Sequence, residues 1–476
     1  MLWYLVLGIN LIQIIVLGRV ILLENRPPEK TVVWLFMLAL LPVLGLILYI
    51  LFGRKTQGPL FFSKHNKDNP LKRWINQQQR DIKNGQMISD PDTNSDSKLI
   101  NLHLNSGFAP MTVHNQVEVL MNGGEKFRAL FNALEGASHH IHLSYYIFKD
   151  DEIGEDVLKI LTRKVTEGVK VRVLLDGMGS LSISGSFMKR MRKAGIQAEW
   201  FFPIRFPYIS SKLNLRYHRK LVVVDGRVGF IGGLNIGDEY LSRDSKLGFW
   251  RDTHIKIEGE AVHTLQSIFL NDWYYVTGKE YSGASYFPQM TISHKLPLQI
   301  LASGPDSNWP SVLQSFFSSI TMAKQSIYIE TPYFIPDESL IMALKTAALS
   351  GLDVRLLVQG IPEHKLTYLA MNSYFEELLQ AGVKIFKYMK GTLHAKILLI
   401  DNHIASVGSA NMDLRSFFLD FEINAFIFDQ SLTGQLIQNF KSDMEESKEV
   451  KLEEFQNRSA ITRFKESCAR LFSPLL

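Results

Sequence analysis

Two segments of the chain repeat the same pattern of chemically active side chains. Each segment holds a histidine, a lysine two residues later, an aspartate seven residues later and an asparagine seventeen residues later. The first copy consists of His218, Lys220, Asp225 and Asn235, and the second of His394, Lys396, Asp401 and Asn411. A single copy would mean little, whereas two copies in register indicate one site built from both.

The paired histidines and lysines suit the transfer of a singly charged phosphodiester group. One neutral imidazole attacks phosphorus, and the other, protonated, delivers a proton to the leaving alkoxide. The lysine and asparagine side chains donate to the charge that grows on the phosphoryl oxygens. No acidic cluster accompanies these residues in the sequence, so we expect no metal and no other cofactor. A strand histidine with a purely structural role would explain one copy but not the matched pair.

Both motifs lie in predicted β-hairpins, YHRKLVVVDGRVGFIGGLN and LHAKILLIDNHIASVGSAN. In a strand, a histidine and a lysine two residues apart point to the same face, so each pair converges on one side of its sheet. Asp225-Gly226 and Asp401-Asn402 stand between two apolar runs, which is typical of a tight turn. The two aspartates belong to the candidate catalytic set through the motif, but their position favours a role in fixing the turn over a role in acid–base chemistry.

The body of the chain also repeats on a larger scale. GASHHIHLSYYIF at 136–148 aligns with MAKQSIYIETPYF, which begins 186 residues later, and a second pair, GVKVRVLLDG and GLDVRLLVQG, follows in the same order. Apolar strands alternate with helical stretches in each half, which predicts an α/β fold of two tandem α/β/α sandwich halves with pseudo-twofold symmetry. We expect the first half over 111–290 and the second over 291–445.

A strongly apolar region precedes this body. Residues 32–52 carry no charge, and residues 1–18 form a second apolar run that only Asn10 and Gln13 interrupt. About 20 apolar residues span the hydrocarbon of a bilayer, so the sequence predicts a two-helix transmembrane hairpin over 1–53. A cleaved signal peptide lacks such a long second run, and a pair of buried core helices would need a polar face.

Charge and composition indicate where the body resides. Residues 54–110 are basic and rich in polar side chains, which is typical of a tether. The cations directly follow the apolar run, so the positive-inside rule predicts a multi-pass membrane protein whose body is cytoplasmic. The single cysteine, Cys468, suits a reducing compartment. A hydrophobic share of 46% excludes a disordered chain, and a net charge of +5 excludes a polybasic one.

The paired motifs resemble those of the phospholipase D superfamily. Together with the apolar N-terminal region, they make the chain similar to bacterial cardiolipin synthases over almost its whole length, which implies a bacterial cell membrane. The resemblance implies a carboxylate that orients the histidine of each half, and Asp252 fits this role in the first half and Glu422 in the second. The family's serine two residues before the asparagine is present as Ser409, whereas Gly233 takes its place in the first half. The resemblance assigns the substrate-binding residues Asn235, Ser409 and Asn411.

The resemblance further implies transfer of a phosphatidyl group between two phosphatidylglycerol molecules. One is attacked to give a phosphatidyl-histidine and free glycerol, and a hydroxyl of the second then takes the phosphatidyl group to give cardiolipin. By analogy, His218 is the nucleophile and His394 the general acid and then base, an order that the sequence alone does not fix.

The alternatives are a membrane-tethered phospholipase D-type hydrolase, a nuclease, a synthase with another donor and a non-enzymatic scaffold. The expected partners are phosphatidylglycerol and the anionic membrane surface, without nucleic acid; the oligomeric state stays open.

Two further segments mix apolar and basic residues. FFPIRFPYISSK at 201–212 either forms a lip that admits lipid or fills the core with its aromatic rings. The C-terminal segment, 446–476, places apolar residues at near-helical spacing with basic residues between them. It either docks on an anionic leaflet or packs against the body.

Overall fold

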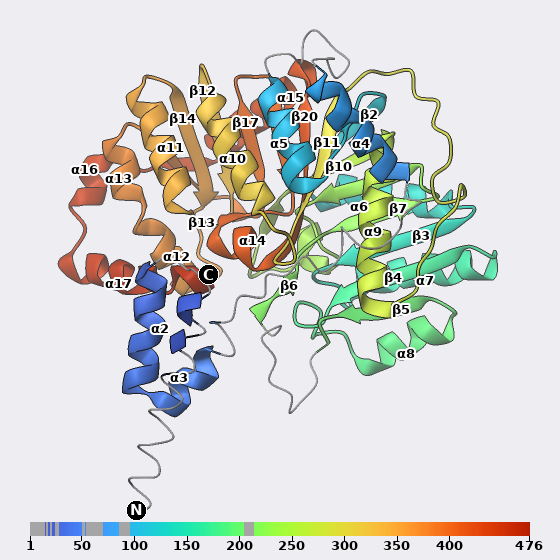
Figure 1. The fold of residues 1–476 in the computed structure, drawn as a ribbon, viewed down its shortest axis with the longest axis horizontal. Helices are drawn as coiled ribbons and strands as arrows, with labels where there is room; N and C mark the ends of the chain where they lie inside the picture. The colour runs from blue at the N-terminus through green and yellow to red at the C-terminus, as the bar shows by residue number, and fades with distance from the viewer. Residues whose placement is uncertain are drawn as a thin grey trace, which may run out of the picture.

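The computed structural model describes residues 28–49, 70–84, 96–203 and 214–476, together with a few positions between 15 and 53. Its body contains two β-sheets that are packed against helices (Figure 1). The predicted α/β body is confirmed. Most of the first apolar run and most of the aromatic and basic segment at 201–212 lie outside the described residues.

The first sheet has seven strands, all from the first half of the chain. Their order is β2-β10-β8-β7-β3-β4-β5. The strands are β2 (Asn115–Met121), β3 (His140–Tyr145), β4 (Lys170–Asp176), β5 (Gln197–Phe201), β7 (Leu221–Val224), β8 (Val228–Gly232) and β10 (Thr253–Gly259).

The second sheet has ten strands, nine of them in the order β1-β11-β20-β18-β17-β12-β14-β15-β21, with β6 paired to β20. These strands are β1 (Met111–Thr112), β6 (Arg216–Tyr217), β11 (Leu298–Ser303), β12 (Ser326–Thr331), β14 (Asp353–Gln359), β15 (Lys384–Tyr388), β17 (Ile397–Ile400), β18 (Ile404–Gly408), β20 (Asp420–Phe428) and β21 (Ser447–Glu449). Two small ladders complete the strands, one between β9 (Phe249–Arg251) and β16 (Gly391–Leu393), the other between β13 (Phe334–Ile335) and β19 (Met412–Asp413).

The two sheets repeat one topology. β3 pairs in parallel with β4 and antiparallel with β7, and β12 pairs in parallel with β14 and antiparallel with β17. The order β10-β8-β7-β3-β4-β5 therefore matches β20-β18-β17-β12-β14-β15. This correspondence agrees with the predicted duplication, and β7–β8 and β17–β18 are the two predicted hairpins.

Helices divide the interior into three main hydrophobic cores. α9 (Ala261–Thr277) and α15 (Gln430–Glu445) contribute to a central core that also receives side chains from both sheets. Along β7, alternate side chains face this central core and the outer core of the first sheet, as the pleat of a strand requires. The helices of the two outer cores are α6 (Asn122–Glu135), α7 (Glu152–Thr166) and α8 (Gly185–Lys193) for the first sheet, and α10 (Ser311–Met322), α11 (Glu338–Leu349), α12 (Lys365–Asn372) and α13 (Phe375–Gln380) for the second.

An aspartate fixes each hairpin turn. Asp225 and Asp401 have φ values of 53° and 52°, and the residue after each also has a positive φ, which is the backbone of a tight hairpin turn. The Asp225 carboxylate accepts the backbone N–H groups of residues 138–140 at 2.7 to 2.8 Å, and the Asp401 carboxylate accepts those of residues 324–326 at 2.6 to 2.9 Å. Each carboxylate thus ties its hairpin to the start of the neighbouring strand.

The region expected to be a tether is partly structured. Residues Pro70–Lys83 form α4 and residues Ser97–Gly107 form α5. Leu99 and Leu104 of α5 are fully buried in the outer core of the second sheet, and the Gln78 side chain of α4 bonds the backbone of Met111. The end of the predicted tether therefore belongs to the body, because the leucine spacing of α5 gives that helix an apolar face.

The predicted membrane-spanning helix over 32–52 is not found as one helix. α2 (Pro28–Leu40) and α3 (Pro42–Leu48) are separated at Leu41, because a proline restricts the residue before it and supplies no N–H to the preceding turn. Within the described part of the chain, no helix has both the length and the apolar content needed to cross a bilayer.

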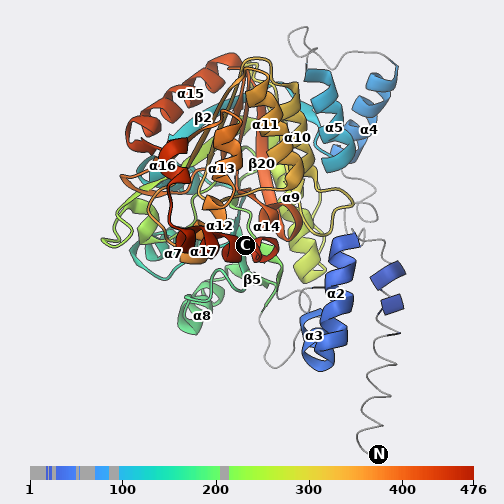
Figure 2. The same ribbon diagram turned by 90° about the vertical axis from the view of Figure 1, so that its left-hand side faces the viewer.

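The C-terminal segment packs against the body. β21 adds to the second sheet beside β15, and α16 (Leu452–Gln456) and α17 (Ala460–Arg470) follow it. α17 lies beside α12, near the C-terminus, which ends in a 3-10 turn, η5 (Ser473–Leu475) (Figure 1, Figure 2).

We expect Asp225→Ala to destabilise the fold, because three backbone N–H groups lose a charged acceptor. The free energy of unfolding should fall by about 2–4 kcal/mol, whereas the control Asp156→Ala, at a half-exposed position on α7, should change it by less than about 0.5 kcal/mol. Denaturant unfolding of both variants measures the difference. Equal stability of the two variants would contradict a role of Asp225 in the turn.

The effect of Asp225 should depend on pH. Partial burial raises the pKa of this carboxyl, but the bonds from the backbone outweigh burial and hold its pKa below the ordinary value. The stabilisation is therefore complete above the ordinary pKa and is lost as pH falls through the lowered folded value. Unfolding curves of wild type and Asp225→Ala should converge in acid.

Candidate active site

Two very short strand pairs carry each histidine to the opposite half of the molecule. β6 pairs in parallel with β20, and the backbone N–H of His218 donates to the carbonyl of Phe421 at 3.0 Å. β16 pairs in parallel with β9, and the backbone N–H of His394 donates to the carbonyl of Arg251 at 2.7 Å. In both places the accepting residue directly precedes one of the two candidate carboxylates.

The carboxylate that orients each histidine therefore comes from the other half. His218 Nδ1 lies 2.9 Å from Oε1 of Glu422, and His394 Nδ1 lies 2.7 Å from Oδ2 of Asp252. Both carboxylates are fully buried. The expectation that Asp252 serves His218 and Glu422 serves His394 is wrong, because the exchanged strands place each carboxylate beside the histidine across the pseudo-twofold axis.

The carboxylates also set the protonation of the rings. With Nδ1 facing a carboxylate, the proton of a neutral ring resides on Nδ1 and the lone pair on Nε2. Burial lowers the pKa of His218 and of His394 to about 4, although each carboxylate acts in the opposite direction. At neutral pH both imidazoles of the free site are therefore neutral. An anionic phosphodiester between them would favour adding a proton to one of them.

The two lysines lie beneath the histidines. Lys220 and Lys396 are buried, and each Nζ donates to the backbone carbonyl of its own motif's histidine, at 2.7 Å for Lys220. Burial lowers the pKa of Lys220 to about 7 and that of Lys396 to about 8. The site thus holds two ammonium groups whose charge is sensitive to pH near neutrality.

The serine and glycine that break the twofold symmetry have a steric explanation. The Ser409 hydroxyl donates to the Glu422 carboxylate and its oxygen accepts the backbone N–H of Ile423 at 3.0 Å. A Cβ at Gly233 would lie 2.1 Å from Oδ1 of Asp252. Because aspartate is one methylene shorter than glutamate, its carboxylate occupies the space that a serine side chain would need.

The two asparagines are not equivalent. The Asn235 carboxamide accepts the backbone N–H of Ile147 at 3.1 Å and donates to the Tyr240 hydroxyl at 3.0 Å. Asn411 interacts with the Asp413 carboxylate, and its buried Oδ1 lacks a hydrogen-bond partner in the described structure. Asn411 therefore keeps a polar atom available, whereas Asn235 is largely engaged by the protein.

Sequence analysis missed three side chains near the catalytic candidates. The ring of Tyr146 lies 4.9 Å from that of His218, and the ring of Trp250 lies 5.2 Å from that of His394. Lys126 is fully buried, donates to the carbonyl of Asn235 and acts electrostatically on Asp252. Trp250 stands two residues before Asp252, a position that offered a signal, but Lys126 lies in an ordinary helical pattern.

Two buried arginines support the exchanged strands. Arg219 donates to Asp272 of α9 at 2.6 Å and to the carbonyl of Glu422 at 3.1 Å. Arg251 donates to Asp443 of α15 at 2.7 Å. The helices of the central core thereby hold the backbone on which the histidines and carboxylates meet.

Among the described residues, one group has donor atoms close enough for a metal ion. Atoms of His218, Asp420 and Glu422 lie within 4.8 Å of one another. Arg415 Nε already lies 3.3 Å from Asp420, while Glu422 engages His218 and Ser409. These acidic groups already have cationic or hydrogen-bonding partners, and a metal-free site stays a prediction.

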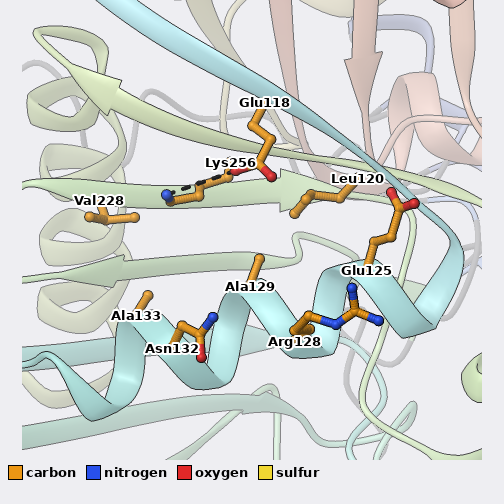
Figure 3. A pocket seen from close by; sticks show the side chains of 9 residues that line it. All are labelled: Glu118, Leu120, Glu125, Arg128, Ala129, Asn132, Ala133, Val228 and Lys256. Carbon is orange, nitrogen blue, oxygen red and sulfur yellow. Dashed lines mark ion pairs between the residues drawn. The ribbon is translucent and has the colours of Figure 1, made fainter.

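A pocket on the first half does not include the catalytic candidates. It has a volume of about 560 Å³ and lies between α6 and the strands β2, β8 and β10 (Figure 3). Its charged side chains are of both signs, with Lys256 Nζ 3.9 Å from Glu118. The motif aspartates are also away from the histidines, since Asp225 and Asp401 lie at the far ends of β7 and β17.

We expect Glu422→Gln to act on His218 and Asp252→Asn to act on His394. Each amide keeps the size of the carboxylate but no longer stabilises an imidazolium, so kcat should fall about 10²–10⁴-fold in either variant. The site-specific rate of modification by diethyl pyrocarbonate, read by mass spectrometry, should change at His218 in the first variant and at His394 in the second. A change in the modification rate only at the histidine of the same half as the substituted carboxylate would contradict the pairing across the two halves.

The comparisons with known proteins cover both halves of this site. A family model described as "Cardiolipin synthase, PLD-like domain" matches residues 130–273 and 316–444, and one described as "Phospholipase_D-nuclease N-terminal" matches residues 11–54. Curated relatives include cardiolipin synthase of Geobacillus thermodenitrificans, 44% identical over 98% of this chain and 92% of that protein, and cardiolipin synthase of Listeria innocua, 41% identical over 99% of each.

A solved structure shares the fold. Phosphatidylserine synthase of Haemophilus influenzae matches with a TM-score of 0.61 and 18% identity, over 81% of this chain and 100% of that one. The sequence matches extend over nearly the whole chain and over both histidine motifs. The chain belongs to the cardiolipin synthase family, with two phospholipase D-like halves.

Proposed function

We propose that the protein is a phosphatidyltransferase that makes cardiolipin and glycerol from two phosphatidylglycerol molecules through a phosphohistidine intermediate. The observation that carries the proposal is the pair of imidazoles, each held at Nδ1 by a buried carboxylate of the opposite half. The curated relatives, cardiolipin synthases at 41 to 44% identity, support cardiolipin as the product.

The first step breaks the bond between phosphorus and the glycerol headgroup. Nε2 of His218 attacks phosphorus, a nitrogen–phosphorus bond forms, and the glycerol oxygen leaves with a proton from His394. In the second step His394 takes a proton from a hydroxyl of the second phosphatidylglycerol. That oxygen attacks phosphorus, the nitrogen–phosphorus bond breaks, and cardiolipin is released. The proposed order of the two histidines follows the superfamily analogy.

The remaining groups stabilise charge on the phosphoryl oxygens. Lys220 and Lys396 supply positive charge beneath the histidines, and Asn411 supplies a carboxamide. We propose Ser409 and Asn235 as residues that position this machinery, since Ser409 bonds Glu422 and Asn235 bonds Tyr240.

For the N-terminal region we propose attachment to a bacterial cell membrane, with the body on the cytoplasmic side. The uncharged run at 32–52, the cations that follow it and the family match at 11–54 support this placement. The substrate then lies in the anionic bilayer to which the protein is attached.

Product analysis tests the proposed function. The purified full chain, given labelled phosphatidylglycerol alone, should release cardiolipin and glycerol in equal amounts, and excess EDTA should leave the rate unchanged. His394→Ala should lower the rate by at least about 10³-fold. Phosphatidic acid as the main product would instead identify a hydrolase, and cleavage of an oligonucleotide without lipid turnover would identify a nuclease.

The rate should also depend on pH through the lysines. Because burial lowers their pKa to about 7 and about 8, raising the pH from 7 to 9 removes positive charge from the free site, so kcat/KM should fall. Lys396→Arg keeps its charge over this range and should show a weaker alkaline decline, whatever its absolute rate. An identical decline in both proteins would exclude Lys396 as the titrating group.

A further inference from the structure

The helix α17 presents an apolar stripe that points away from the body. Ile461, Phe464 and Leu471 are 67%, 70% and 80% exposed. Their spacing, with Cys468 between the last two, follows intervals of three and four residues and places them on one face of the helix. Leu475 of the following 3-10 turn continues the stripe and is 41% exposed.

The opposite face of α17 and the turn η5 contact the body through the buried Ala469 and through polar side chains. Glu466 is buried and accepts a hydrogen bond from Arg458, and Ser473 bonds the hydroxyl of Tyr374 at 2.9 Å. A surface helix ordinarily turns its apolar side toward the core. Here the apolar side is the free one, so the stripe is not explained by packing within the chain.

The C-terminal end of the stripe lies beside the active site. Arg415 donates to the carbonyl of Leu475 at 3.4 Å and to the carbonyl of Asn214 at 2.6 Å. Asn214 is four residues before His218, and the same arginine lies 3.3 Å from Asp420, two residues before Glu422. One side chain thus links the stripe to the two segments that lead into a histidine–carboxylate pair.

Other exposed apolar residues lie near the histidine of the second half and on α12, the helix beside α17. Gln359 accepts the backbone N–H of Leu393, next to His394, and donates to the carbonyl of Ile361 at 2.6 Å. Ile361 is 45% exposed and Leu366, on α12, is 43% exposed. α12 and α17 lie at the end of the body from which α2 and α3 extend, in both views (Figure 1, Figure 2).

The charge of α17 complements an anionic surface. Its exposed charged residues are Arg463, Lys465 and Arg470, of which Arg470 also lies 3.5 Å from Glu377. Its one acidic residue, Glu466, is buried and paired. An apolar stripe flanked by cations is typical of a helix that lies in the interface of an anionic bilayer.

We propose that α17 and η5 form an interfacial segment that rests on anionic phospholipid and holds the mouth of the active site at the level of the headgroups. The proposal deepens the proposed function, because it gives the site direct access to a substrate that resides in the bilayer. The flanking cations and the position beside the histidines favour lipid over a protein partner.

The single cysteine of the chain, Cys468, allows a direct test because it lies on the stripe. A nitroxide on Cys468 of the full chain is compared in nanodiscs of phosphatidylcholine alone and of phosphatidylcholine with phosphatidylglycerol. We expect the ratio of oxygen to water-soluble nickel accessibility to rise at least about fivefold with phosphatidylglycerol, as apolar depth increases. An equal accessibility ratio in the two kinds of nanodisc would overturn the proposal. Protection of Cys468 by a second copy of the chain rather than by lipid would overturn it as well.

A matched pair of substitutions provides a second test. Leu471→Asp lies on the stripe, and the control Leu349→Asp lies at the C-terminal end of α11, where the leucine is 74% exposed. On vesicles with phosphatidylglycerol, Leu471→Asp should lower kcat/KM about tenfold, since burial of one leucine corresponds to a factor of ten or more. The control should stay unchanged, and equal effects of both would contradict the proposal.

The proposed cardiolipin synthesis and the proposed docking of α17 and η5 on lipid can fail separately. In detergent micelles both aspartate variants should retain wild-type cardiolipin formation, which tests the proposed function without a bilayer. The His394→Ala chain labelled at Cys468 should show the same response to phosphatidylglycerol as the labelled active protein. Loss of cardiolipin formation in Leu471→Asp micelles would mean that α17 serves the fold of the site rather than docking.

Discussion

Each imidazole of the active site is held against a buried carboxylate that arrives from the other half of the chain. This arrangement depends on two parallel strand pairs, one of two residues and one of three, that place His218 beside Glu422 and His394 beside Asp252. Neither half therefore holds a complete histidine–carboxylate pair. The central core, which takes side chains from both sheets, and the buried Arg219 and Arg251 contacts keep these strands in register.

Burial then determines what the paired groups can do. Burial lowers the pKa of both histidines and of both lysines. The negative charge of a bound substrate would favour the protonated forms of these groups. Burial of these side chains also limits the access of water, which would compete with an alcohol as the acceptor. The glutamate with a serine beside it and the aspartate with Gly233 beside it give the two imidazoles different surroundings. Such a difference suits a reaction in which one ring attacks phosphorus and the other moves protons.

Much of the fold could be predicted because its signals are local or repeated. The hairpins follow from apolar runs around Asp225 and Asp401, and the two-half α/β body follows from aligned strands. The exchange of carboxylates could not be predicted, because β6 and β16 are too short to carry a periodic pattern and repeat alignment compares each half only with its equivalent. Helix α5 lies in a mostly polar region, so its sequence gave no clear helical signal. The long apolar run around Pro42 favoured one continuous helix over a break at this proline.

Trapping the covalent intermediate tests the central claim most directly. A phosphatidyl ester of p-nitrophenol needs no proton on its leaving group, so His394→Ala should release one nitrophenol per site and stop, because the second step lacks its base. Peptide mapping of the acid-labile product should then place the phosphatidyl group on Nε2 of His218. A label on His218 that disappears in Glu422→Gln, but not in the control Asp156→Ala, would agree with the exchanged pairing. No burst, or a label on any residue other than His218, would contradict the account.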